Sequence, residues 1–147
     1  MKIIIEEIEG FGETEITIKC QSISDEIIEF INEYKLLDNR IWGSLNKESY
    51  ILNPVDIYYI ETIDNKVFAY TNDKVYELNQ KLYVLEKILP NKYFFRASKS
   101  MIINISKIIS IKSLLNGRIQ AKLDNDENVI ISRSNVILFK EKLGVNK

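Results

Sequence analysis

Three short segments of the chain gather residues that could do recognition chemistry. Arg96, Lys99 and Ser100 lie close together, and Ser132, Arg133, Ser134 and Asn135 stand where a helix is expected to begin. Asp64-Asn65-Lys66 has the composition of a hairpin turn. Their cations, hydroxyls and amides can donate to phosphate oxygens and to N7 and O6 of guanine, which favours a nucleic-acid partner. Taken singly, Ser134 or Asn135 could be an ordinary helix cap, and Arg96 could form a surface ion pair.

The residues needed for most catalytic centres are missing. The chain has no histidine, which excludes histidine-dependent triads and histidine metal sites. It has one cysteine, Cys20, and no glycine-rich phosphate loop. The acidic turn at Asp124, Asp126 and Glu127 does not have the glycine and distal glutamate of a calcium loop. We therefore expect no enzyme, cofactor, metal or small-molecule substrate. A carboxylate enzyme is the weaker alternative.

The net charge of −1 conceals an uneven distribution. Residues 1–48 contain 5 Lys/Arg and 11 Asp/Glu, whereas residues 49–147 contain 15 and 10. Between Glu86 and Asp124 there are eight basic residues and no acidic one. An asymmetry of this kind indicates an anionic partner, or else a solvated basic face. We expect the stretch from Lys87 to Lys122, with Arg133, to form a single cationic surface.

The spacing of apolar residues predicts two domains. Residues 1–40 are expected to form a strand–strand–helix unit, with strands at 2–9 and 15–20 and a helix from Ser22 or Ser24 to Leu37. Residues 41–147 show short alternating segments separated by turns, first as a β-meander, with helices expected at 79–89 and 136–143. The predicted fold class is mainly β (α+β), with short antiparallel strands in small packed sheets and short helices.

Composition also indicates where the protein acts. The chain is 46% hydrophobic and 28% charged, as in globular proteins with a core. No apolar run approaches the roughly 20 residues that span a bilayer. The N-terminus turns acidic after three isoleucines, unlike a secretory signal, and a single cysteine fits a reducing compartment. We expect a cytoplasmic protein.

Residues 42–143 resemble the LytTR-type DNA-binding domain of bacterial regulators. The resemblance rests on four stretches that occur in the family's order: PVDIYYIE from Pro54, FFRASKSMIIN from Phe94, KIISI from Lys107, and ISRS from Ile131 ahead of Phe139. It implies a bacterial transcription regulator that binds double-stranded promoter DNA. In this family, loops rather than a recognition helix enter successive major grooves.

The resemblance also implies site residues. By position, Lys99 and Arg133 fall on base-contacting sites, and a third contact falls at Asn65 or Lys66. The residues that fall on backbone-contacting or loop-shaping positions are Arg96, Ser100, Asn104 and Ser132, of which Asn104 could equally be structural. Lys107, Lys112 and Arg96 are expected to meet phosphates. The whole predicted DNA-binding set is Asn65, Lys66, Arg96, Lys99, Ser100, Asn104, Lys107, Lys112, Ser132, Arg133, Ser134 and Asn135.

Residues 1–40 are too short for the phosphoreceiver domain that precedes many family members. The chain resembles the stand-alone subgroup, often encoded beside a small membrane protein, which makes such a protein a possible partner. The apolar helix face of Ile27, Phe30, Ile31 and Tyr34 in this acidic unit indicates a homodimer or a protein partner. The alternative for the whole chain is a protein–protein interaction module with no nucleic-acid role.

Overall fold

The computed structural model describes residues 2–12, 14–38 and 40–145. The chain divides into two compact units, Met1–Lys35 and Leu36–Lys147, so the division falls before the boundary near residue 40 that the sequence suggests. Within the described ranges, no helix has both the length and the apolar character needed to cross a membrane.

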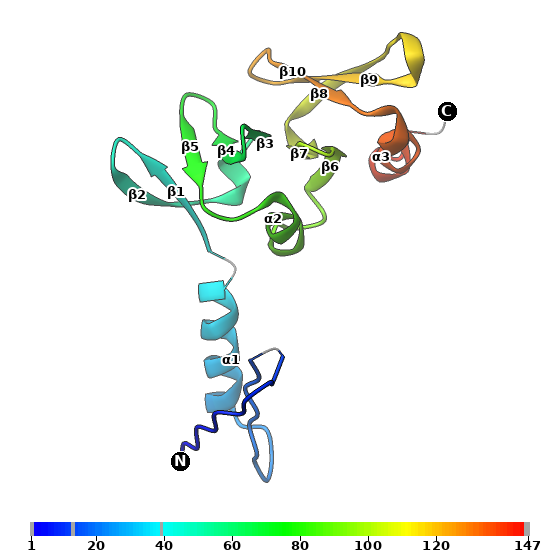
Figure 1. The fold of residues 1–147 in the computed structure, drawn as a ribbon. Helices are drawn as coiled ribbons and strands as arrows, with labels where there is room; N and C mark the ends of the chain where they lie inside the picture. The colour runs from blue at the N-terminus through cyan, green and yellow to red at the C-terminus, as the bar shows by residue number, and fades with distance from the viewer. Residues whose placement is uncertain (1, 13, 39, 146–147) are drawn as a thin grey trace. The chain divides into compact units, whose positions relative to one another are not determined.

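Among the described residues of the first unit, the one regular element is the helix α1 (Asp25–Asp38), whose last three residues extend past Lys35 (Figure 1). The Ser24 hydroxyl accepts a hydrogen bond from the Ile27 amide at 3.4 Å and so caps the helix, as predicted. The prediction of two strands is wrong, because residues 2–12 and 14–24 contain none. Alternation alone does not make a sheet, since an isolated pair of strands is only marginally stable in water.

The second unit is rich in antiparallel sheet, which confirms the predicted fold class. Seven strands form one sheet in the order β2-β1-β5-β4-β3-β7-β6. They are β1 (Ile41–Leu45), β2 (Glu48–Leu52), β3 (Tyr59–Ile63), β4 (Lys66–Tyr70), β5 (Val75–Leu78), β6 (Phe94–Ser98) and β7 (Met101–Asn104). A second sheet has the order β10-β9-β8, built from β8 (Ile108–Ser113), β9 (Ile119–Leu123) and β10 (Asn128–Ile131).

The meander is only partly as predicted. β3, β4 and β5 pair in sequence, but β2 does not pair with β3, and β1 pairs with β5 instead. The 3-10 turn η1 (Pro54–Asp56) separates β2 from β3. Gly43 permits the β1–β5 approach, because a Cβ at this position would lie 2.7 Å from the Cβ of Tyr76.

Two helices and two cores complete the second unit. Helix α2 (Leu82–Ile88) is shorter than the predicted 79–89, whereas α3 (Val136–Leu143) matches its prediction. Neighbouring residues of β7 point to opposite faces: Ile102 packs in a core with α2, and Ile103 packs in a core with the three-stranded sheet and Phe139 of α3. The seven-stranded sheet is therefore buried on both faces around β7, which fixes the strands that carry the site.

One end of the seven-stranded sheet carries the turn predicted at Asp64-Asn65-Lys66 and also the β6–β7 turn (residues 99–100). β3 and β4 pair as far as Ile63 and Lys66, so Asp64 and Asn65 form a two-residue turn, with φ values of 50° and 65°. The Thr62 amide donates to the Ser100 carbonyl at 2.9 Å, which brings the β6–β7 turn to the same end. The β4–β5 turn, which contains Lys74, lies at the opposite end.

Candidate nucleic-acid interface

The β6–β7 turn presents Lys99 and Ser100 at the surface. The Ser98 hydroxyl accepts a hydrogen bond from the Ser100 amide at 3.2 Å and lies 3.4 Å from the Ser100 hydroxyl. The ladder between β6 and β7 shifts register between Arg96 and Ser98, as in a β-bulge. The turn is therefore short, irregular and internally bonded, which holds the backbone of Lys99 in place.

The guanidinium of Arg96 binds the backbone of this turn. Nε donates to the Ser98 carbonyl at 2.7 Å, and one terminal nitrogen donates to the Lys99 carbonyl at 2.6 Å. The other terminal nitrogen lies 2.9 Å from a carboxylate oxygen of Glu86 on α2. These three contacts engage each of the three nitrogens of the planar guanidinium. Arg96 therefore shapes the loop and forms the ion pair that the sequence left open.

The second segment follows β10 and leads into α3. The Ser132 amide donates to the Ala97 carbonyl of β6 at 2.9 Å, which joins this segment to the strand that carries the first turn. Residues Arg133–Asn135 form the 3-10 turn η4, closed by the Asn135 amide and the Ser132 carbonyl at 2.9 Å. The hydroxyls of Ser132 and Ser134 are 3.3 Å apart.

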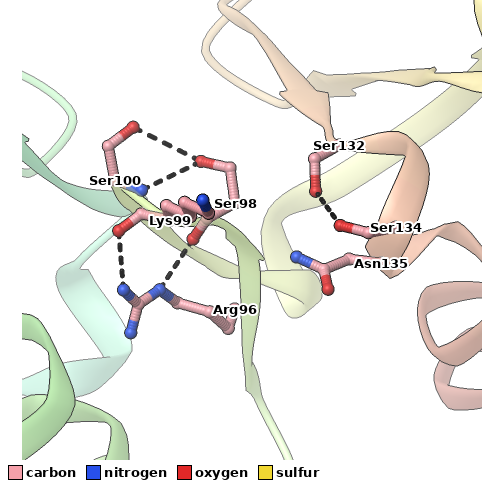
Figure 2. Close-up of a pocket in the computed structure, with 7 residues that line it drawn as sticks. All are labelled: Arg96, Ser98, Lys99, Ser100, Ser132, Ser134 and Asn135. Carbon is pink, nitrogen blue, oxygen red and sulfur yellow. Dashed lines mark hydrogen bonds between the residues drawn. The ribbon is translucent and has the colours of Figure 1, made fainter.

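A recess of about 610 Å³ lies between the two segments. Figure 2 shows the side chains of Ser98, Lys99 and Ser100 on one side and those of Ser132, Ser134 and Asn135 on the other. Arg96 also lines the recess, and none of its seven described lining residues is acidic. A surface of hydroxyls, an amide and cations without a carboxylate suits phosphate oxygens and base edges. The structure thus brings together six of the predicted residues: Arg96, Lys99, Ser100, Ser132, Ser134 and Asn135.

Arg133 does not line this recess, although it is exposed and lies between two residues that do. Its side chain passes close to Gly117 in the turn between β8 and β9. Asn65 and Lys66 lie at the end of the sheet that carries the β6–β7 turn, and both are exposed.

Asn104 is buried, with a relative exposure of 1%. Its amide nitrogen donates to the Ile57 carbonyl at 2.8 Å, and its side-chain oxygen accepts from the Ser106 amide and hydroxyl at 3.0 and 2.7 Å. A side chain so enclosed has no surface to offer DNA. The structural alternative is therefore the right one for Asn104, and its assignment as a DNA contact is corrected.

Lys107 also lies away from the recess. Its ammonium is 4.9 Å from the centre of the Tyr58 ring, which is cation–π distance. The nearby Asp124 carboxylate, and then burial, raises the pKa of Tyr58 to about 12. Lys107 ends the 3-10 turn η2 (Ile105–Lys107) directly before β8, at the end of the three-stranded sheet opposite the β8–β9 turn. Lys112, which pairs opposite Gln120, lies near the β8–β9 turn and is exposed.

The expectation of one cationic surface from Lys87 to Lys122 needs correction. Arg96 forms an ion pair with Glu86, and the Lys122 ammonium lies 3.7 Å from a carboxylate oxygen of Asp126. Lys122 and Lys107 lie at the end of the three-stranded sheet away from Arg133. The eight basic residues lie on different helices, strands and turns, which end at different edges of the two sheets, so a cluster along the sequence did not become a cluster in space.

Ser98 lines the recess but was missed in the sequence analysis. A signal was present, because Ser98-Lys99-Ser100 and Ser132-Arg133-Ser134 are the same serine–cation–serine pattern. Glu86 and Gly117 carry no such local signal, since each lies close to a site residue that is distant along the chain, Arg96 and Arg133 respectively.

Comparison with known proteins agrees with this geometry. Residues 47–144 match the family model of the LytTr DNA-binding domain. The chain is 34% identical over 97 residues to the sensory transduction protein LytT of Enterococcus faecalis, a match that covers 66% of this chain and 40% of that protein. It is 32% identical over 135 residues to an HTH-type transcriptional regulator of Staphylococcus aureus, covering 90% of this chain and 91% of that one.

A solved LytTr DNA-binding domain from Bacillus cereus has the same fold, with a TM-score of 0.68 and 23% sequence identity, over 71% of this chain and 96% of that one. These findings favour the predicted resemblance over the alternative of a protein-interaction module. The chain belongs to the family of LytTr DNA-binding domains.

Proposed function

We propose that this chain is a bacterial transcription regulator that binds duplex DNA with the two serine–cation–serine segments, Ser98–Ser100 and Ser132–Ser134. Lys99 and Arg133 read base edges in the major groove, and Asn65 or Lys66 supplies a third contact. The observation that carries this proposal is the recess between the two segments, which is lined by hydroxyls, an amide and cations and by no described carboxylate.

The chemistry assigns different roles to these groups. Arginine and lysine can donate to N7 and O6 of guanine, and such contacts discriminate between bases. The serine hydroxyls are short and bonded within their own segments, which, with the short Asn135 side-chain amide beside them, suits them to phosphates that set the register of the protein. Because α2 and α3 are separated by five strands, turns rather than a helix pair present these side chains.

The test is a fluorescence anisotropy titration of the full chain on duplex DNA from the upstream region of its own gene. Lys99→Ala and Arg133→Ala should each weaken specific binding by about 1–3 kcal/mol and relax base preference at one position. Lys74→Ala is the matched control, because it removes the same charge at the opposite end of the sheet. Intact affinity and preference in both variants would contradict the proposal.

The first unit is assigned to self-association. Ile27 is half-buried, and the remaining residues of this unit whose exposure is described lie at the surface, including Phe30, Ile31 and Tyr34 of α1. An apolar helix face without a core of its own favours a partner surface. The 90% coverage by the Staphylococcus aureus relative extends well beyond residues 47–144 and so includes most of this unit.

We assign that surface to a homodimer, with a small membrane protein as the second candidate partner. Phe30→Asp should turn a dimer into a monomer in sedimentation of the full chain, because it places a charge within the apolar face. Asn32→Asp, which adds the same charge to α1 outside that set, should not. A monomer in the unmodified chain would leave the membrane protein as the partner to test by co-purification.

The proposed activity is binding in the cytoplasm, without catalysis or a cofactor. The residues that line the recess hold and orient a polyanion, and the reading of sequence needs only hydrogen bonds from Lys99 in this recess and from Arg133 and the β3–β4 turn outside it. Retention on generic DNA at low salt that is lost at high salt is the simplest first measurement, because phosphate contacts release counterions.

A further inference from the structure

The turn between β8 and β9 has an unusual backbone at two consecutive residues. Asn116 and Gly117 have φ values of 70° and 75°, in the left-handed region that glycine adopts without cost and asparagine tolerates. The Leu114 amide donates to the Arg118 carbonyl at 2.8 Å and closes the turn. The turn is therefore a defined structure rather than a loose connection.

Gly117 of this turn lies directly against Arg133. A Cβ added at Gly117 would stand 3.0 Å from both Cγ and Cδ of Arg133, which is tighter than an ordinary carbon–carbon contact. The aliphatic part of the Arg133 side chain thus runs across the backbone of the turn at a position where no side chain intervenes.

We propose that Gly117 is a positioning residue that directs the Arg133 guanidinium toward its base. The inference rests on the proposed function, in which Arg133 reads a base edge. An exposed arginine has several rotatable bonds, and ordering it costs conformational entropy. A stem held against a rigid turn loses part of that freedom before DNA arrives, which favours binding.

The geometry of recognition makes the direction important. A bidentate contact to guanine requires the planar guanidinium to align with two acceptors at once. The backbone of Arg133 is fixed by η4 and by the bond from Ser132 to Ala97, so the remaining freedom lies in its side chain. A methyl group at Gly117 would push that side chain at its middle and so redirect its tip.

The experiment compares Gly117→Ala with Asn116→Ala in the full chain. Both place alanine at a positive φ, so both carry similar backbone strain, but only the first adds an atom against Arg133. Gly117→Ala should reduce affinity for the specific site about fivefold or more, the lower end of one bidentate contact. Asn116→Ala should leave base preference at the Arg133 position unchanged.

A double-mutant cycle with Arg133→Ala identifies the cause. If Gly117 acts through Arg133, Gly117→Ala should have no further effect on affinity or base preference once Arg133 is alanine. Additive losses would overturn the inference. Gly117→Asn covers the case in which Gly117→Ala does not fold, because asparagine tolerates the left-handed backbone but keeps the added Cβ. An unchanged base preference in Gly117→Asn would equally overturn it.

The outcomes for the two proposals are distinct. If Arg133→Ala alone leaves affinity and preference intact, the proposed function of Arg133 fails. If Arg133→Ala relaxes preference while Gly117→Ala and Asn116→Ala behave alike, the proposed function stands and the positioning role of Gly117 fails.

Discussion

The two serine–cation–serine segments have nearly the same sequence and are held in place by different means. The first has one backbone bond from outside, from the Thr62 amide to the Ser100 carbonyl, and is otherwise fixed by side chains, because Arg96 binds the carbonyls of Ser98 and Lys99 and the Ser98 hydroxyl accepts a hydrogen bond from the Ser100 amide. The second is fixed by backbone, through the bond from Ser132 to Ala97 and the closure of η4. Its hydroxyls bond only to each other among the described contacts.

This difference shows that similar recognition residues can depend on dissimilar supports. Substitutions of side chains behind the first segment should disturb DNA binding, whereas equivalent substitutions in the second should change the contact and leave the backbone in place. Substitutions at the first segment should therefore lower both stability and DNA affinity, whereas substitutions at the second should lower DNA affinity with little change in stability.

The largest loss of stability is expected away from both segments, at Asn104. Asn104→Ala removes one buried and two partly buried hydrogen bonds and leaves the buried Ile57 carbonyl without this donor, so the free energy of unfolding should fall by about 3 kcal/mol in urea titrations. DNA affinity, measured where the variant is still folded, should stay within about twofold, because Asn104 is buried.

Ser106→Ala is the milder companion variant, since it removes one of those bonds and should cost about 1 kcal/mol. Should Asn104→Ala keep its stability yet lose DNA binding, Asn104 would belong to the interface after all, and the two segments would not be the whole of it.

Arg96→Ala should lose less stability than Asn104→Ala but should change DNA binding more clearly. Two bonds to carbonyls disappear, so stability should fall by about 1–2 kcal/mol, and Lys99 should lose its fixed direction. Base preference should relax at the Lys99 position and remain at the Arg133 position. Footprinting on variant sites measures both positions in one experiment.

Glu86→Gln tests the ion pair separately from the two hydrogen bonds that Arg96 donates to the carbonyls of Ser98 and Lys99. The Glu86 side chain is 49% exposed, and exposed ion pairs contribute little, so its loss should cost well under about 1 kcal/mol and leave both base preferences intact. A loss at both positions in Arg96→Ala would show that the two segments are coupled, against the separate supports inferred here.

The sequence predicted features that depend on neighbours along the chain better than features that depend on tertiary contacts. Local patterns sufficed for the strands of the second unit, the Asp64–Asn65 turn, α3 and the polar character of the two segments, because these depend on neighbours along the chain. The contact of Arg96 with Glu86, that of Gly117 with Arg133 and the pairing of β1 with β5 depend on tertiary register. The two N-terminal strands failed for the same reason, since alternation indicates a strand only where a sheet is present to complete it.

The smallest effects give the sharpest comparison, between Ser98→Ala and Ser132→Ala. Ser98→Ala removes the acceptor of the Ser100 amide and should cost about 1 kcal/mol of stability. The Ser132 hydroxyl meets only that of Ser134, at 3.3 Å on the surface, so Ser132→Ala should change stability by less than about 0.5 kcal/mol.

Both substitutions should weaken DNA binding, Ser98→Ala by loosening a turn and Ser132→Ala by deleting a donor. Because a deleted phosphate contact weakens all sequences alike, Ser132→Ala should keep its base preference, whereas Ser98→Ala should relax it at the Lys99 position. Equal stability losses in thermal unfolding would mean that the two segments share one kind of support.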